Sequence, residues 1–197
     1  MATNRGKSHE LRIIAGQWRG RRLRFPAGPD IRPTPDRVRE TLFNWLAAHV
    51  RGARVLDLFA GSGALGLESL SRGAAYAKFI DTDLRAITAL RERFVEWRVP
   101  ADAAEAVRAD ATALAAAKPA AGEAPYDIIF LDPPFAASLW QTMAERLDRN
   151  GWLAPKAFIY IEAPVRQPME SLPQHWVRWR DGAAGEVGYY LFRTGDT

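Results

Sequence analysis

Residues 132–135 read Asp-Pro-Pro-Phe and follow directly after a run of four apolar residues. Proline has no main-chain N–H, so two successive prolines end a buried strand and begin a stiff loop. The amine of a nucleobase is a poor nucleophile, because its lone pair is delocalised, and it must be held by its N–H groups. Asp132 and the carbonyl of Pro133 offer acceptors to such an amine, while Pro134 removes a competing donor. Phe135 offers a flat face for base stacking, so this tetrapeptide is a candidate catalytic site, with a strand-ending turn as the alternative.

A glycine-rich segment lies between an apolar run and a helical pattern. Gly61, Gly63 and Gly66 form the pattern G-x-G-x-x-G within residues 56–68. Such glycines permit a tight turn and let a ligand approach the backbone. Asp81 lies 20 residues after Gly61, where a carboxylate can accept hydrogen bonds from ribose hydroxyls. The loop and the acid together predict an adenosine-type cofactor, with a glycine-rich turn that binds nothing as the alternative.

Asp57 distinguishes between the adenosine cofactors. It lies four residues before Gly61, at the mouth of the glycine loop. A carboxylate there repels the pyrophosphate of NAD, which binds at a helix N-terminus, and it suits the cationic amine and sulfonium of S-adenosylmethionine. No Gly-Lys-Ser/Thr follows the glycines, as a phosphate-binding P-loop would require. The sequence therefore favours S-adenosylmethionine over NAD.

The elements that carry these residues alternate between strand and helix. Strands are expected at 54–59, 76–81, 105–110, 126–132 and 157–163, with helices at 64–72, 84–98 and 138–149. Two last strands, 176–181 and 187–193, have no helix between them. This order is typical of a doubly wound α/β domain whose mostly parallel sheet ends in an antiparallel edge. Ligands bind beyond the carboxyl ends of such strands, which brings the glycine loop and residues 132–135 to one rim.

The N-terminal part is expected to differ from this pattern. Residues 11–25 contain two short apolar runs around a turn at 17–20, which predicts a β-hairpin. Thr34 is expected to cap a helix that begins at Pro35 and ends near Val50. We divide the chain into a basic N-terminal extension, residues 1–35, and a catalytic domain, residues 36–197.

The charge of the 197-residue chain is concentrated at its N-terminus. Residues 1–39 contain ten basic and three acidic residues, a net charge of +7 in a chain whose total is +4. Nine of the ten are arginine, which binds phosphate in bidentate fashion and stacks on bases, so a nucleic-acid partner is favoured over a solvated terminus. There is no cysteine, no signal-peptide pattern and no apolar run of about 20 residues, so we expect a cytoplasmic protein without a membrane partner.

Four segments carry a resemblance to a known family. They are RIIAGQWRGRRL (12–23), RPTPDRVRETLFNWL (32–46), LDLFAGSGALGLESLSRGA (56–74) and the tetrapeptide at 132–135. The tetrapeptide resembles the signature of S-adenosylmethionine-dependent amino methyltransferases, and the chain from about Arg12 to Phe192 resembles the RsmD family of 16S ribosomal RNA guanine-N2 methyltransferases. The resemblance implies a Rossmann-like class I methyltransferase fold with a seven-stranded, mostly parallel sheet, an antiparallel edge and an N-terminal hairpin.

The motifs and the resemblance together assign the candidate site residues. The catalytic residues are Asp132, Pro133, Pro134 and Phe135. The cofactor-binding residues are Thr34, Arg37, Asp57, Phe59, Ala60, Gly61, Ser62, Gly63, Asp81, Thr82, Asp110 and Ala111. The RNA-binding residues are Arg19, Arg21, Arg22, Arg24, Arg32 and Arg39, and no metal site is expected. In the family the ribose-binding acid is often glutamate, where this chain has Asp81.

The resemblance also implies the partner. It is 16S ribosomal RNA, either free or in a small-subunit assembly intermediate, bound by a monomeric enzyme. Three alternatives stay open: a DNA adenine-N6 or cytosine-N4 methyltransferase, a nicotinamide oxidoreductase, and an RNA-binding module that has lost catalysis. Asp57 and the tetrapeptide argue against the second, and the presence of every catalytic element argues against the third.

Overall fold

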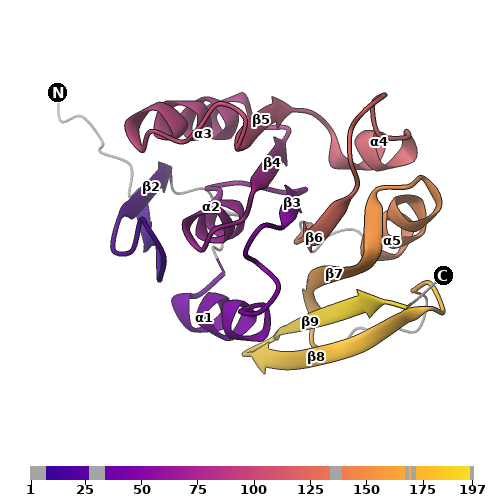
Figure 1. Cartoon of the computed structure of the whole chain (residues 1–197). Helices are drawn as coiled ribbons and strands as arrows, with labels where there is room; N and C mark the ends of the chain where they lie inside the picture. Colours follow the sequence, from indigo (N-terminus) through magenta and orange to yellow (C-terminus); the bar gives the residue numbers. More distant parts are fainter. Residues whose placement is uncertain (1–7, 27–33, 134–138, 167–168, 170–171, 196–197) are drawn as a thin grey trace, which may run out of the picture.

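A seven-stranded sheet forms the centre of the protein (Figure 1). The computed structural model describes residues 8–26, 34–133, 139–166, 169 and 172–195. Its strands are β3 (Arg54–Asp57), β4 (Tyr76–Asp81), β5 (Ala104–Arg108), β6 (Tyr126–Leu131), β7 (Leu153–Pro164), β8 (Trp176–Ala184) and β9 (Val187–Thr194). They are arranged in the order β5-β4-β3-β6-β7-β9-β8. All neighbours are parallel except β9, which is antiparallel to both β7 and β8.

Helices cover both faces of this sheet, as the alternation in the sequence predicts. Helices α1 (Asp36–Trp45), α2 (Ala64–Ser71) and α3 (Leu84–Glu96) lie on one side, and α4 (Ala111–Ala116) and α5 (Leu139–Arg149) on the other (Figure 1). The apolar residues accordingly form two core clusters, one on each face of the sheet. No helix in the described part of the chain is long and apolar enough to cross a membrane.

The strand order reverses between β3 and β6. From β3 the chain proceeds outward through β4 to β5, and the later strands β6 and β7 continue on the other side of β3. The connection after β3 therefore leads to one side of the sheet, toward β4, and the connection after β6 leads to the other side, toward β7. Open α/β sheets bind their ligands at this kind of reversal, outside the carboxyl ends of the strands. The fold thus places the loop after β3 and the residue after β6 at the position where a ligand is expected.

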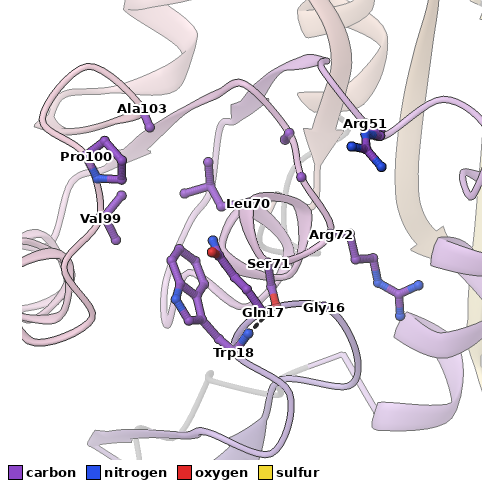
Figure 2. A pocket seen from close by; sticks show the side chains of 12 residues that line it. Gly16, Gln17, Trp18, Arg51, Leu70, Ser71, Arg72, Val99, Pro100 and Ala103 are labelled. Carbon is purple, nitrogen blue, oxygen red and sulfur yellow. Dashed lines mark hydrogen bonds between the residues drawn. The ribbon is translucent and has the colours of Figure 1, made fainter.

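The N-terminal hairpin packs on helix α2. Its strands β1 (Ser8–Arg12) and β2 (Arg22–Pro26) are antiparallel. The turn between them lies against the C-terminal end of α2, where Trp18 N–H donates to the Ser71 hydroxyl at 3.0 Å and Gln17 N–H donates to the Ser71 carbonyl at 2.8 Å (Figure 2). The buried Glu68 carboxylate accepts from the main chain of Ile14 and Ala15 at 2.7 and 3.0 Å. The hairpin is therefore held against α2 by hydrogen bonds from its main chain to Glu68 and Ser71.

We expect Gly16→Ala to detach this hairpin. A Cβ at position 16 would lie 1.8 Å from the Ser71 carbonyl oxygen, and the residue has φ +83°. Gly20, in the same turn, has φ +82° with open space around it, so Gly20→Ala carries only the backbone strain. We expect Gly20→Ala to cost about 1 kcal/mol of unfolding free energy and Gly16→Ala at least about 2 kcal/mol more. Guanidinium denaturation of both variants measures the difference, and equal losses would contradict the docking described here.

Several element boundaries differ from those expected. Helix α1 ends at Trp45, and residues 46–50 form turns. The prediction that Thr34 caps this helix is wrong, because the N-cap position is Pro35 and the Thr34 hydroxyl bonds to Glu162 on β7. Strand β7 begins at Leu153, before the expected residue 157, and its pairing with β6 contains an irregularity.

Candidate active site

The carboxyl ends of five adjacent strands carry acidic residues. Along the sheet from β5 to β7 these are Asp110, Asp81, Asp57, Asp132 and Glu162. Asp57 and Asp81 are the last residues of β3 and β4, whereas Asp132 directly follows β6. No group of three or more potential metal ligands converges among the described residues, so these acids form a row along the rim. A row of carboxylates suits a ligand that carries positive charge.

The glycine loop connects β3 to helix α2 and begins this rim. Gly61 has φ +50° with nothing within 4 Å of an added Cβ, so its outer side is open to a ligand. Gly63 has φ +77° and is the N-cap of α2, and a Cβ there would lie 2.3 Å from Leu90. A Cβ on Gly66 would lie 2.2 Å from the Phe79 ring, so this glycine allows α2 to pack closely on β4. The three glycines thus serve the open loop, the turn into the helix and the helix packing, respectively.

Asp81 is hydrogen-bonded to the same loop. Its Oδ2 accepts from Gly61 N–H at 2.7 Å and its Oδ1 from Asp83 N–H at 2.8 Å. Each carboxylate oxygen retains a further lone pair, so the group can hold the loop and still accept from a ribose hydroxyl. Thr82 is exposed beside it. The structure therefore brings the glycine loop and the second-strand acid together, as the 20-residue spacing predicts.

Asp57 is buried at the start of the loop. Its Oδ2 accepts from the Gly66 N–H at 3.1 Å, inside the first turn of α2. Burial raises the pKa of Asp57 to about 7, because the Gly66 hydrogen bond only partly offsets the desolvation and the Asp81 charge adds to it. An amine or sulfonium nearby would favour the ionised form of this carboxyl. Asp57 thus suits the cationic cofactor that its position in the sequence indicates.

Asp132 and Glu162 lie side by side on neighbouring strands. Leu131 on β6 pairs with Ile161 on β7, so the next residue of each strand follows at the same level. Burial raises the pKa of Asp132 well above its usual value, and the charges of Glu162 and Asp57 raise it further. Burial also raises the pKa of Glu162, although hydrogen bonds from Thr34 and Tyr160 oppose this. The candidate acceptor of the target amine therefore has a second, unpredicted carboxyl beside it.

Most of the remaining cofactor candidates lie along the same rim. Asp110 follows β5, is exposed, and caps helix α4 by accepting from Thr112 N–H at 2.7 Å and Ala113 N–H at 3.2 Å. The hydrogen bond from the Thr112 hydroxyl, together with these two, lowers the pKa of Asp110. Phe59, Ala60 and Ser62 belong to the glycine loop and Ala111 begins α4. Arg37 is exposed on α1.

The predicted RNA-binding arginines lie in different surroundings in the structure. Arg19 is exposed in the hairpin turn, Arg21 stacks over the Trp97 ring at 5.3 Å, and Arg22 pairs with Glu10 at 2.9 Å. The prediction for Arg39 is wrong, because this side chain is fully buried and donates to Asp36 at 2.7 Å and to the Arg12 carbonyl at 2.8 Å. It joins α1 to the hairpin and is unavailable to a phosphate.

Some predicted site residues fall outside the described part of the chain. These are Pro134, Phe135, Arg32 and the side chain of Arg24. Conversely, sequence reasoning missed Glu162 and Tyr160, which belong to the apolar run of β7. The only sequence signal for them is a single acid near the carboxyl end of a buried strand, at the level where the other four strands also carry acids.

A cavity of about 460 Å³ lies away from this rim (Figure 2). It is bordered by the hairpin turn at Gly16–Trp18, the end of α2, and Ala103 just before β5. These are the amino ends of the strands, whereas the acids occupy the carboxyl ends. The cavity is thus a separate feature, formed where the hairpin meets the sheet domain.

Comparisons with known proteins agree on one family. The family model described as Conserved hypothetical protein 95 matches residues 11–193. Ribosomal RNA small subunit methyltransferase D of Escherichia coli K12 is 44% identical over 190 residues, which cover 96% of this chain and 93% of the relative. The solved structure of the yhhF protein of Escherichia coli is 42% identical, with a TM-score of 0.85 over 96% of this chain and 100% of that one.

A more distant structure shares the fold. An RNA methyltransferase from Salinibacter ruber, solved in complex with S-adenosyl-L-homocysteine, is 18% identical, with a TM-score of 0.61 over 84% of this chain and 95% of that one. The sheet order, the N-terminal hairpin and the rim of acids thus occur in a chain that matches the family model over nearly its whole length. The chain therefore belongs to the RsmD family, that of ribosomal RNA small subunit methyltransferase D.

Proposed function

We propose that this protein transfers a methyl group from S-adenosylmethionine to the exocyclic N2 of a guanine in 16S ribosomal RNA. The observation that carries this proposal is the 44% identity, over 96% of the chain, to ribosomal RNA small subunit methyltransferase D. The acid-lined rim supports the same activity, because its chemistry suits a cationic methyl donor next to an amine acceptor. Guanine N2 is the target that the resemblance of the whole chain implies.

The residues present fit the cofactor. Gly61 leaves its outer side open, Asp81 offers lone pairs where ribose hydroxyls would lie, and Asp57 offers a buried carboxyl for the methionyl amine. Asp110 is exposed at the adjoining strand end, where the adenine amine would lie. S-adenosylmethionine, when bound, supplies an electrophilic methyl group on a sulfonium. The chain itself contributes binding and orientation, which can account for much of the rate of a methyl transfer.

The acceptor side of the site begins at Asp132. Its carboxyl and the carbonyl of Pro133 would accept the two N–H groups of the target amine and aim its lone pair at the methyl carbon. Pro133 is buried, and Asp132 keeps a partly exposed surface that a target amine could reach. Stacking of the target base on Phe135 remains a prediction. An orienting role for Asp132 needs only its oxygen atoms, and removal of the amine proton is a separate role.

The test is a mapping experiment. The protein is incubated with labelled S-adenosylmethionine and small ribosomal subunits that lack the modification, and with the deproteinised RNA of those subunits. We expect a single labelled guanine carrying N2-methyl, and faster labelling of the particle if the substrate is an assembly intermediate. Label in adenine N6 or cytosine N4, or in duplex DNA, would instead favour the DNA methyltransferase alternative. We propose that the enzyme acts as a monomer in the cytoplasm.

The hairpin arginines carry a separate prediction about RNA binding. If Arg19, Arg21 and Arg22 neutralise phosphates, replacing each by glutamine should flatten the slope of log affinity against log salt by about 0.7–0.9. Cofactor affinity should not change, since the hairpin contacts the opposite end of α2 from the glycine loop. The measurement is RNA binding across a salt series, with melting temperature recorded for each variant. A loss of thermal stability with an unchanged slope would mean that these arginines only cover the hairpin.

A further inference from the structure

On the acceptor side of the rim, a small polar network joins strand β7 to the segment before helix α1. Glu162 Oε1 accepts from the Thr34 hydroxyl at 2.6 Å and from the Tyr160 hydroxyl at 2.9 Å. Thr34 lies just before Pro35, the N-cap of α1, and is 128 positions from Glu162 in the sequence. Both Thr34 and Glu162 are buried, at 8% and 6% exposure. Buried carboxylates are costly unless they are hydrogen-bonded, so these contacts fix the Glu162 side chain.

The neighbouring carboxyls of Glu162 and Asp132 have unequal surroundings. Glu162 accepts two hydroxyl hydrogen bonds, whereas no described residue donates one to Asp132. Hydrogen bonds of this kind favour the charged form of the group that accepts them, and a like charge nearby disfavours ionisation. Of the two, Glu162 therefore carries the negative charge more readily, and Asp132 holds a proton more readily. The pair titrates as a coupled unit.

The other groups that face this pair can be named from each adjoining element. Asp57 approaches Asp132 from β3, and its charge acts in the same sense as that of Glu162. Tyr160 lies on the same strand as Glu162, and Tyr189 faces Tyr160 from β9. The pKa of Tyr160 is raised well above its usual value by burial and by Glu162, so its hydroxyl stays protonated and donates. Tyr160 also faces Asp132, but its protonated hydroxyl adds no charge. Among the described residues, the charges that act on Asp132 are thus those of Glu162 and Asp57.

We propose that Glu162 is a positioning residue for the methyl transfer: it anchors Thr34 beside the acceptor site and sets the charge that Asp132 carries when the target amine arrives. The proposal rests on the proposed function, because it assumes that Asp132 faces that amine. Glu162 itself acts through Asp132 and Thr34. A purely structural role would require only the two hydrogen bonds, which the carbonyl oxygen of glutamine can also accept, although less strongly than a carboxylate.

Glu162→Gln separates these roles. We expect the rate of a single turnover on undermethylated small subunits to fall at acidic pH as Asp132 becomes protonated. In the Glu162→Gln variant, the pH at which the rate falls should be lower by about one unit. The reason is that one of the two negative charges that favour protonation of Asp132 is gone. Glu105→Gln is the matched control, since Glu105 is exposed near the amino end of β5 and should leave this pH unchanged. An absence of this shift in a folded Glu162→Gln protein would overturn the proposal.

A second measurement keeps the proposal testable if Glu162→Gln does not fold. Thr34→Val removes one hydrogen bond to Glu162 without changing any charge. Glu162 should then take up a proton more easily, and the Asp132 carboxyl should titrate at lower pH in a carbon-13 NMR titration than it does in the wild type. An unchanged Asp132 titration would overturn the proposal. Failure of the wild type to methylate small-subunit RNA would instead refute the proposed function. The NMR titration does not depend on activity, so it tests the effect of Glu162 on Asp132 in either case.

Discussion

Replacing Asp132 by alanine is expected to lower the single-turnover methylation rate by roughly two to four orders of magnitude. The alanine variant loses the carboxyl that would hold the amine N–H, so the lone pair is no longer aimed at the methyl carbon. Affinity for S-adenosylmethionine should change by less than about threefold, because the glycine loop and Asp81 do not depend on this side chain. Rapid-quench kinetics and calorimetry on the same preparations measure the two quantities.

Two further variants sharpen this experiment. Asp132→Asn keeps one acceptor oxygen and should retain more activity than Asp132→Ala. Asp127→Asn is the matched control, because Asp127 lies at the amino end of the same strand and accepts from Arg54 N–H at 2.8 Å, away from the rim. It should methylate at the wild-type rate. Wild-type turnover in Asp132→Ala would mean that the tetrapeptide is a strand-ending turn without a chemical role.

Asp81→Ala should mainly affect the cofactor. We expect affinity for S-adenosylmethionine to fall by about 10- to 150-fold, which corresponds to roughly 1.5–3 kcal/mol for lost hydrogen bonds to a charged group. Part of this loss has a structural origin, because Asp81 also accepts from Gly61 and holds the loop. Asp81→Glu should restore much of the affinity, since it restores a carboxylate that can reach a ribose hydroxyl.

The control for Asp81 is its neighbour Asp83. Asp83 caps helix α3 and pairs with Arg85 at 2.9 Å, and asparagine preserves the cap. Asp83→Asn should therefore bind the cofactor as the wild type does. Isothermal titration with S-adenosylmethionine and its demethylated product tests all three proteins. Undiminished binding by Asp81→Ala would remove Asp81 from the cofactor site.

Much of the fold could be predicted from local patterns. The strand expected at 76–81 is observed with those bounds, because apolar and breaker residues mark both of its ends. The start of β7 could not be predicted in this way. Pro155 interrupts the run and Lys156 has a left-handed φ of 62°, yet the strand continues through both, with an irregular pairing to β6. Pairing with β6 thus extends β7 over residues that their local sequence does not predict to be strand.

The candidate site was predictable where a motif is continuous in sequence. Asp57, Asp81 and Asp132 each follow from the spacing of glycines, prolines and strands, and the rim brings them together. Glu162 could not be found this way, because its partner Thr34 lies 128 positions away and nothing local links them. Arg39 was misassigned for the opposite reason. A basic residue in a basic segment resembles a surface residue, and only the packing of α1 against the hairpin shows that it is buried.

Helix α2 connects the glycine loop to the N-terminal hairpin and sets the distance between them. Its first residue follows the glycine loop, and Ser71, its last, holds the hairpin turn. All eight of its residues are buried, so it has little freedom to bend. At about 1.5 Å per residue it spans about 12 Å. If the hairpin contacts the RNA backbone, the methyl donor then lies at a fixed distance from that contact. The enzyme would then select its nucleotide by this distance as well as by the chemistry of the base.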